Sequence, residues 1–293
     1  MYYLLLLAAA LLLACDFAVN KLYQKIAGTK ISAGLLFNSL LGLFTAIVFL
    51  AANGFKCSFT VFSLIMAFLT AVIIMSYNII GFRILKNGSM ALYTLFLMTG
   101  GMTVPYIWGL LFLDETFSWL RTIGLLLIII AIVLPNIDTQ RLDVKHLIMC
   151  AAVFIINGFS SVVGKIHQTE TVYETVSAMD FVVLAGVMRF LIAGIAYIVV
   201  RLKKIEQKSV EFTGKKILLC GMLIVGSAVV GGMSQVFNLI SASHLPATVL
   251  YPFLTGGSII LSAIAGITFF KERPSKSVIF GIGLCFVGTV MFL

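Results

Sequence analysis

The sequence of 293 residues predicts an all-α integral membrane protein whose ten transmembrane helices form two inverted five-helix repeats. Hydrophobic residues make up 61% of the chain and charged residues 11%, whereas soluble domains average about 45–50% and about 25%. The mean hydropathy of +1.14 agrees with this composition. Charged side chains are too few to cover the surface of a soluble fold of this length. We therefore expect lipid to surround most of the protein.

Five apolar stretches in the first part of the chain are long enough to cross a bilayer, because a spanning helix needs about 20 mainly apolar residues. The runs are continuous and show no period-2 alternation, which favours helices over barrel strands. Asp16 lies within the first stretch and Pro105 within the fourth. The expected spans are 2–20, 31–52, 59–82, 88–113 and 117–135.

The second part of the chain supplies five more stretches of the same kind. The seventh holds Asp180 and Arg189, and the ninth holds Pro252. The fifth and tenth stretches carry almost no polar groups, so we expect them at the periphery, with Gly281 and Gly288 on one packing face. The expected spans are 145–164, 175–200, 216–240, 245–270 and 274–293.

Short segments recur in the same order in both parts, which indicates an internal repeat. The matched pairs are Lys21–Gln24 with Lys165–Gln168 at an offset of 144 residues, Met98–Gly101 with Leu254–Gly257 at 156, and Gly109, Glu115 and Gly124 with Gly266, Glu272 and Gly281 at 157. We therefore expect one membrane unit of two halves, 1–137 and 144–293. Five helices are an odd number, so the second half must cross the membrane in the opposite sense, an architecture typical of transporters.

Residues 13–21 and 157–165 resemble the first-helix pattern Trp-Gly-x-Asn-Phe-x-x-x-Lys of the EamA-like branch of the drug/metabolite transporter superfamily. The Glu-to-Gly spacing after the fourth and ninth stretches and the Arg189–Phe190 pair are also similar to that family. The resemblance covers the whole chain and implies a ten-helix fold and small-molecule transport across the cytoplasmic membrane of a bacterium. Leu13 and Asn157 replace the family's Trp, and Asp16 stands where an amide is usual, so the substrate does not carry over.

Basic residues are distributed unevenly between the connecting segments. The odd-numbered segments hold sixteen Lys and Arg residues, and the even-numbered ones hold only Lys56, Arg121 and Lys165. Cytoplasmic loops carry the excess of Lys and Arg, so the charge bias places both termini outside the cell. The family resemblance implies cytoplasmic termini instead, and the sequence leaves both orientations open.

Ionisable groups inside a span are costly and mark functional sites by default. Arg189 could hold a carboxylate or phosphate of a substrate, and Asp16 could bind a cation or carry a coupling proton. Asn20 lies four residues after Asp16 on the same helical face. The alternative is structural: an Asp16–Arg189 pair or an Arg189–backbone contact that fixes helix positions. Glu115 and Glu272, at span ends, are expected to be capping charges.

Further polar residues within the spans are candidates for contact with substrate. Amides are a costly way to pack helices, whereas a stripe of Ser and Gly favours close packing. Tyrosines could bind an aromatic or cationic group, or could be ordinary core. The candidates are Asn78, Tyr93, Asn157, Ser160, Gln235, Asn238 and Tyr251, with Gly100, Gly101, Gly256 and Gly257 as hinge or gate positions and a small-residue stripe at Ser227, Gly231, Ser234, Asn238 and Ser241.

These residues predict a secondary active transporter for a small polar or amphipathic metabolite, such as an amino-acid-like solute or an amine, with the bilayer as its environment. The alternative is a flippase for lipid-linked substrates or an accessory membrane subunit of the same fold. We expect no enzyme activity, cofactor, metal site or nucleic-acid partner, because the chain lacks clustered ligands, a nucleotide-binding loop and a basic domain. The sequence is compatible with a monomer or a dimer.

Overall fold

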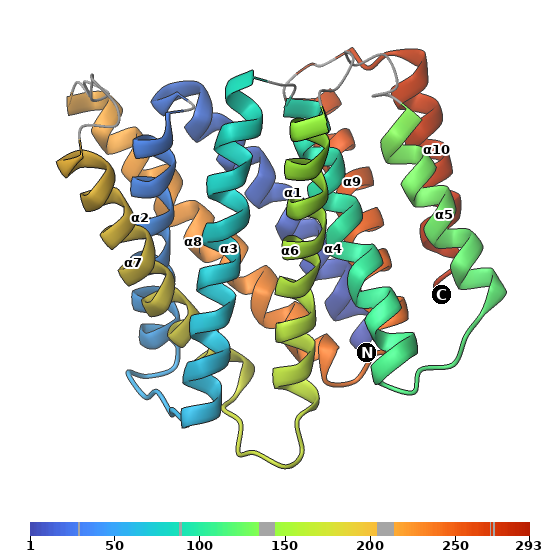
Figure 1. The fold of residues 1–293 in the computed structure, drawn as a ribbon, viewed down its shortest axis with the longest axis horizontal. Coiled ribbons are helices and arrows are strands. Elements are labelled where there is room, and N and C mark those ends of the chain that lie inside the picture. Colours follow the sequence, from blue (N-terminus) through green and yellow to red (C-terminus); the bar gives the residue numbers. More distant parts are fainter. Residues whose placement is uncertain (29, 88–89, 135–143, 204–213, 270, 272) are drawn as a thin grey trace.

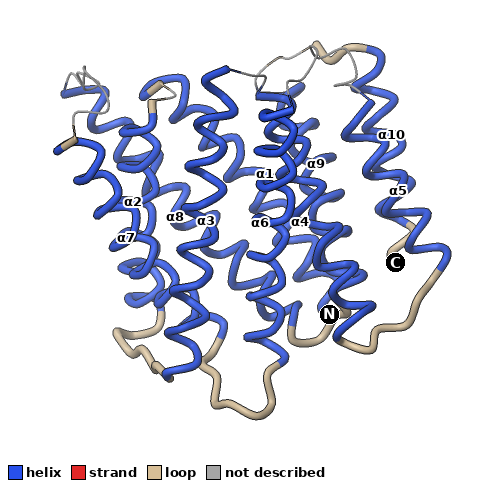
Figure 2. The backbone as a smooth tube through the Cα atoms, in the orientation of Figure 1, coloured by secondary structure: helices blue, strands red, loops and turns tan. Residues whose placement is uncertain are grey.

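The computed structural model describes residues 1–293 except 29, 88–89, 135–143, 204–213, 270 and 272. The described part is built from α-helices joined by short segments (Figure 2). The helices are α1 (Tyr2–Ala27), α2 (Ile31–Ala52), α3 (Val61–Asn87), α4 (Met90–Phe112), α5 (Trp119–Val133), α6 (Val144–Thr169), α7 (Ala178–Leu202), α8 (Gly214–Ala242), α9 (Ala247–Phe269) and α10 (Lys276–Val290). The expected boundary between the halves, near residue 137, and the expected capping charge Glu272 lie outside the described residues.

Eight of these helices are long and apolar enough to cross a membrane, which confirms the expected multi-pass membrane protein. The described residues form ten helices in total, but α5 and α10, with 15 residues each, are shorter than these eight. At 1.5 Å per residue each is about 22 Å long, whereas the hydrocarbon core is about 30 Å thick. Helix α10 begins after Ser275, whose side chain accepts a hydrogen bond from the amide of Val278.

Successive helices run in alternating directions, so the connections gather at two ends of the bundle (Figure 1). We call the end that carries both termini the terminal face and the opposite end the basic face. Lys25 in the last turn of α1, Lys30 before α2 and Lys276 at the start of α10 lie at the basic face. The uneven charge distribution of the sequence therefore corresponds to two chemically different ends of one bundle.

The first and sixth helices extend further than the sequence predicted. The expected spans ended at residues 20 and 164, but α1 continues to Ala27 and α6 to Thr169. Lys21 is consequently in a helix, and Lys165, which was expected in a connecting segment, is a buried residue of α6 with 5% of its surface exposed. The apolar run stops before these lysines, but the backbone hydrogen bonds of the helix do not.

Helices from the two parts of the chain interleave. Helix α1 packs against α8 and α9, while α6 packs against α3 and α4. At the middle of the left side in Figure 1, α2 packs against α7 so closely that Gly42 and Gly186 bring their backbones together. A Cβ atom on Gly42 would lie 2.6 Å from the carbonyl oxygen of Gly186, so only glycine allows this approach.

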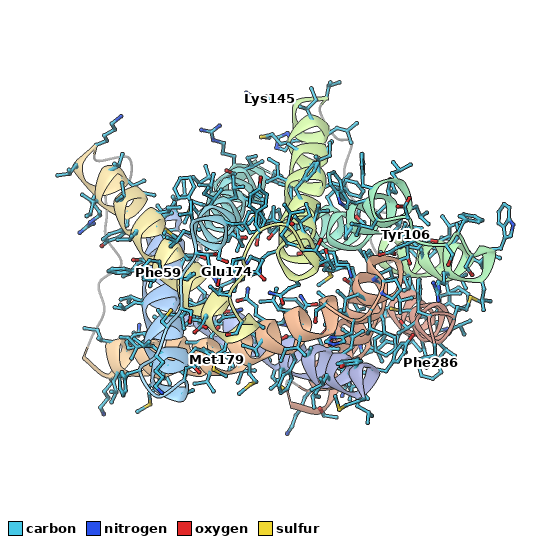
Figure 3. All side chains as sticks on the ribbon, turned by 90° about the horizontal axis from the view of Figure 1, so that it is seen from below. Phe59, Tyr106, Lys145, Glu174, Met179 and Phe286 are labelled. Atoms are coloured by element: carbon cyan, nitrogen blue, oxygen red, sulfur yellow. The ribbon has the colours of Figure 1, made fainter. Side chains whose placement is uncertain are left out.

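Helices α5 and α10 form a pair at one edge of the bundle, as expected for stretches without polar groups (Figures 1 and 3). Phe286, labelled in Figure 3, points outward and is 59% exposed. The expected packing face of α10 is confirmed, because a Cβ atom on Gly288 would lie 2.7 Å from the carbonyl oxygen of Gly124. The pair therefore closes one side of the molecule and leaves the other eight helices to surround its interior.

Candidate functional site

Asp16 lies in the interior between α1 and α8. Its carboxylate accepts hydrogen bonds from Ser227 Oγ on α8 and from Asn20 Nδ2, at 3.0 Å, on its own helix. Asn20 reaches it because residues four apart lie on the same face of a helix. Gly231 on α8 leaves room for the carboxylate, since a Cβ atom there would lie within 3.2 Å of it. The predicted Asp16–Asn20 pairing is thus present, and Ser227 completes it.

Arg189 lies on α7 opposite Asn38 of α2. The guanidinium donates two hydrogen bonds to Asn38 Oδ1, from Nε at 3.2 Å and from Nη2 at 2.5 Å. Asn38 is 7% exposed, and its Nδ2 donates to the carbonyl of Gly34 at 2.8 Å, which orients the amide oxygen towards Arg189. Asn38 therefore fixes the guanidinium without neutralising its charge.

The two charged groups attract each other across the interior. Among the residues that the structure describes, however, no direct ion pair joins Asp16 to Arg189, and the guanidinium bonds a side chain rather than backbone. In place of the ion pair or the backbone contact of the structural alternative, Arg189 contacts the side chain of Asn38, which joins α7 to α2. Ionisable groups in a low-dielectric interior cost free energy unless each has a compensating partner.

A small cavity lies beside Arg189, between α2, α3, α7 and α8. It is lined by Thr45, Thr70 and Gln235 together with the close-packed Gly42 and Gly186. Its volume is about 20 Å³, room for about one water molecule. The predicted residue Gln235 thus lines the same cavity as Arg189, and this cavity is too narrow for a metabolite.

Two other predicted residues contribute to a seam between α6 and its neighbours. Asn157 Nδ2 donates to the carbonyl of Leu97 at 2.6 Å, and Tyr251 Oη donates to the carbonyl of Ser161 at 2.6 Å. Tyr251 is 4% exposed. Both polar groups are used in joining helices, so in this state neither is available to a substrate as the sequence suggested.

The remaining polar candidates are spread over three helices. Tyr93 on α4 packs against Gly81 and Tyr77 of α3 in an apolar cluster, which matches the alternative reading as core. Asn78 on α3 and Ser160 on α6 are half-buried. Asn238 on α8 has a buried Oδ1 that makes no hydrogen bond. The structure does not place these four residues in one group with Asp16 and Arg189.

The glycine pairs and the stripe on α8 mainly serve close packing. A side chain on Gly100 would collide with Phe154 of α6, and one on Gly256 with Thr289 of α10. Gly101 faces Asn157, and Gly257 faces Ala10 of α1.

The stripe of small residues on α8 faces α1. Ser234 Oγ on this stripe donates to the carbonyl of Ala9 at 2.8 Å, and Ser227 Oγ donates to Asp16. The packing interpretation of these small residues is confirmed.

Two charged residues that the sequence assigned no binding role join the helices at the terminal face. Lys165 Nζ donates to the carbonyl oxygens of Ala242 and Leu245, each at 2.6 Å, at the end of α8. Glu115 accepts hydrogen bonds from the amides of Ala247, at 2.5 Å, and Thr248, at 2.8 Å, at the start of α9. The expectation that Glu115 is a capping charge is confirmed, and the helix it caps is α9.

Further polar contacts join helix ends at the same face, which Figure 3 views from below with Glu174 marking the α6–α7 connection. Asn53 Nδ2 donates to Asp180 Oδ1 at 2.9 Å and joins the end of α2 to the start of α7. Ser63 Oγ lies 2.9 Å from Nε2 of His167, a fully buried residue near the end of α6. Asp180 is therefore a structural residue, and the terminal face is closed by bonds between helices.

The sequence left Asn38 and Lys165 without a role in the site and assigned Ser227 only to the small-residue stripe. Asn38 and Ser227 carry polar groups inside spanning helices, which is the signal that marked the other candidates. Their partners lie 151 and 211 residues away along the chain. Single-sequence reasoning has no means of pairing such distant residues.

Comparisons with known proteins test the fold but not the activity. No protein-family model and no curated protein matches the chain. A solved structure described only as a crystal structure of a protein is similar, with a TM-score of 0.76 and 15% identity, over 99% of this chain and 95% of that one. The fold is therefore shared with another protein over nearly its whole length.

Proposed function

We propose that the protein is a secondary active transporter that moves a small polar or amphipathic metabolite, such as an amino-acid-like solute or an amine, by alternating access. The observation that carries this proposal is the pair of opposite charges, Asp16 and Arg189, held inside spanning helices without a direct ion pair. Such charges cost free energy in a membrane and mark substrate or ion pathways. The connections that the structure describes between these helices are short.

The helix contacts support two inverted repeats. Each helix of one half has a counterpart five places later or earlier in the chain. The α1–α8 contact thus corresponds to the α6–α3 contact, and the α1–α9 contact corresponds to the α6–α4 contact. The same correspondence maps the α2–α7 and α5–α10 contacts onto themselves, and α1 and α6 run in opposite directions. Two halves with equivalent contacts can exchange conformations, and this exchange opens one face while it closes the other.

The two charged groups divide the binding task in the proposed mechanism. Arg189, oriented by Asn38, holds an anionic group such as a carboxylate or phosphate, since a guanidinium presents several donors in a fixed plane. Asp16, with Asn20 and Ser227, holds a cationic group or a coupling proton. The cavity of about 20 Å³ must widen to admit a solute, so binding and conformational change are linked.

The EamA-like branch of the drug/metabolite transporter superfamily remains our proposed family, on the motifs at residues 13–21 and 157–165. We also propose the cytoplasmic membrane of a bacterium as the location. The basic face then lies in the cytoplasm by the charge bias, which places both termini outside, although the family resemblance implies the reverse. Both orientations keep the central site in the membrane.

A thermal-shift screen of the purified protein tests the proposed function. Amino acids, amines, nucleosides, sugar phosphates and lipid-linked sugars are added one at a time, and the melting temperature is measured, because a solute that binds only the folded state raises it. We expect solutes that carry both a positive and a negative group to give the largest shifts. Shifts confined to lipid-linked sugars would contradict the proposal and support the flippase. Chemical turnover of a solute without any gradient would support an enzyme.

A further inference from the structure

The contacts of Lys165 and Glu115 have a common physical basis. The C-terminal end of a helix carries partial negative charge and free carbonyl groups, and the N-terminal end carries partial positive charge and free amide groups. Lys165 places a cation on the end of α8, and Glu115 places an anion on the start of α9. The two charges also attract each other across the α8–α9 turn.

These charge-assisted bonds tie the α8–α9 turn to the rest of the terminal face. Lys165 ties it to α6, and Glu115 ties it to the segment between α4 and α5. Gly109 on α4 makes the second contact possible, because a Cβ atom there would lie 2.7 Å from Oε2 of Glu115. The turn cannot leave the terminal face without breaking four hydrogen bonds, two to Lys165 of α6 and two to Glu115 of the α4–α5 segment, and bonds to charged side chains are stronger than neutral ones.

The internal repeat gives Lys165 a counterpart on the basic face. Lys21 matches it at the offset of 144 residues and lies on α1, the counterpart of α6. The environments differ sharply, since Lys165 is 5% exposed and Lys21 is an exposed residue. The packing of the two helices differs as well. Helix α6 packs against α8, whereas the equivalent pair, α1 and α3, makes no substantial contact among the described residues.

We propose that Lys165 and Lys21 are alternating gate residues. In the state described here the Lys165 clamp closes the terminal face and Lys21 is exposed on the basic face. When the basic face closes, Lys21 binds the C-terminal end of α3, the Lys165 clamp opens, and the central site becomes accessible from the terminal face. This inference rests on the proposed function, because it assigns the gates of the same central site.

Thiol accessibility measures the clamp without any solute. Ser241 lies in the last turn of α8, beside the carbonyl of Ala242, and is fully buried. In the purified full-length protein with the unburied Cys15 and Cys57 replaced by serine, N-ethylmaleimide should label the thiol introduced by Ser241→Cys slowly. Adding Lys165→Gln should raise that labelling rate at least tenfold, because the amide keeps much of the side-chain volume but loses the cation. Glu115→Gln should act in the same direction through the other half of the clamp.

Matched variants give this experiment its controls. Lys56→Gln removes a lysine from an exposed position on the same face and should leave the rate unchanged, and Lys21→Gln should leave it unchanged or lower it. The native thiols of Cys150 and Cys285, both fully buried, should stay unlabelled unless the fold is lost. If Lys165→Gln prevents folding, Glu115→Gln decides the question.

An unchanged rate in the folded Lys165→Gln and Glu115→Gln variants would overturn the proposal. Equal increases with Lys165→Gln and Lys21→Gln would also overturn it, because they would indicate general loosening rather than alternation. The labelling needs neither a substrate nor transport. Its failure is therefore distinguishable from a failure of the proposed function, which the solute screen tests separately.

Discussion

The Arg189→Met variant should bind solutes of the central site about 10- to 100-fold more weakly than the wild-type protein. This range follows from the loss of charge-assisted hydrogen bonds worth about 1.5–3 kcal/mol. Methionine has a similar length and is tolerated in apolar surroundings. Asn38 keeps its bond to the carbonyl of Gly34, so the α2–α7 contact should survive. The measurement is the solute concentration that gives half of the maximal melting-temperature shift.

Arg201→Met is the matched control, because it removes an arginine from the exposed end of the same helix. Its affinity should equal that of the wild type. Arg189→Lys adds a second comparison, since lysine keeps the charge but cannot make the same planar contact. We expect partial recovery with lysine. Wild-type affinity in a folded Arg189→Met variant would remove Arg189 from the binding site.

Asp16→Asn should cause a loss of similar size in solute binding or in coupling. The variant removes the negative charge and points an amide donor at groups that now donate to the carboxylate, Ser227 Oγ and Asn20 Nδ2. A buried donor left without an acceptor costs about 1–3 kcal/mol, so the melting temperature should also fall. Solute binding and melting temperature are measured on the same sample to separate the two effects.

Asp114→Asn supplies the control for Asp16. Asp114 is exposed in the segment between α4 and α5 and has a φ of 51°, which asparagine also tolerates. It should change neither binding nor stability. If Asp16→Asn lowers the melting temperature but leaves solute affinity and transport intact, Asp16 has only a structural role and joins α1 to α8.

Hydropathy predicted the number and order of the helices because a membrane forces long apolar runs. The ends were harder, as α1 and α6 show. Lys21 and Lys165 look like loop residues in a hydropathy pattern, yet the helix continues past them. A lysine can stay helical because its side chain reaches water or a set of carbonyl oxygens. The expected lengths of α5 and α10 were too long, because apolar residues continue beyond the end of the described helix.

The central site was only partly predictable. Asp16, Asn20 and Arg189 stood out because a charge or amide inside a span is costly. Asn157 and Tyr251 stood out for the same reason but bond backbone carbonyls of neighbouring helices. A buried polar group can meet its need for a partner in either way, and sequence does not say which. Only the packing of α6 against α4 and α9 distinguishes these cases.

The most direct test of the account is solute counterflow in liposomes that contain the purified protein. Vesicles are loaded with the solute that gives the largest thermal shift, and a trace of the isotope-labelled solute is added outside. We predict a transient accumulation of label that Arg189→Met abolishes and Arg201→Met leaves intact. Tight binding of the solute without accumulation of label in the wild-type protein would contradict the proposal that this protein is a transporter.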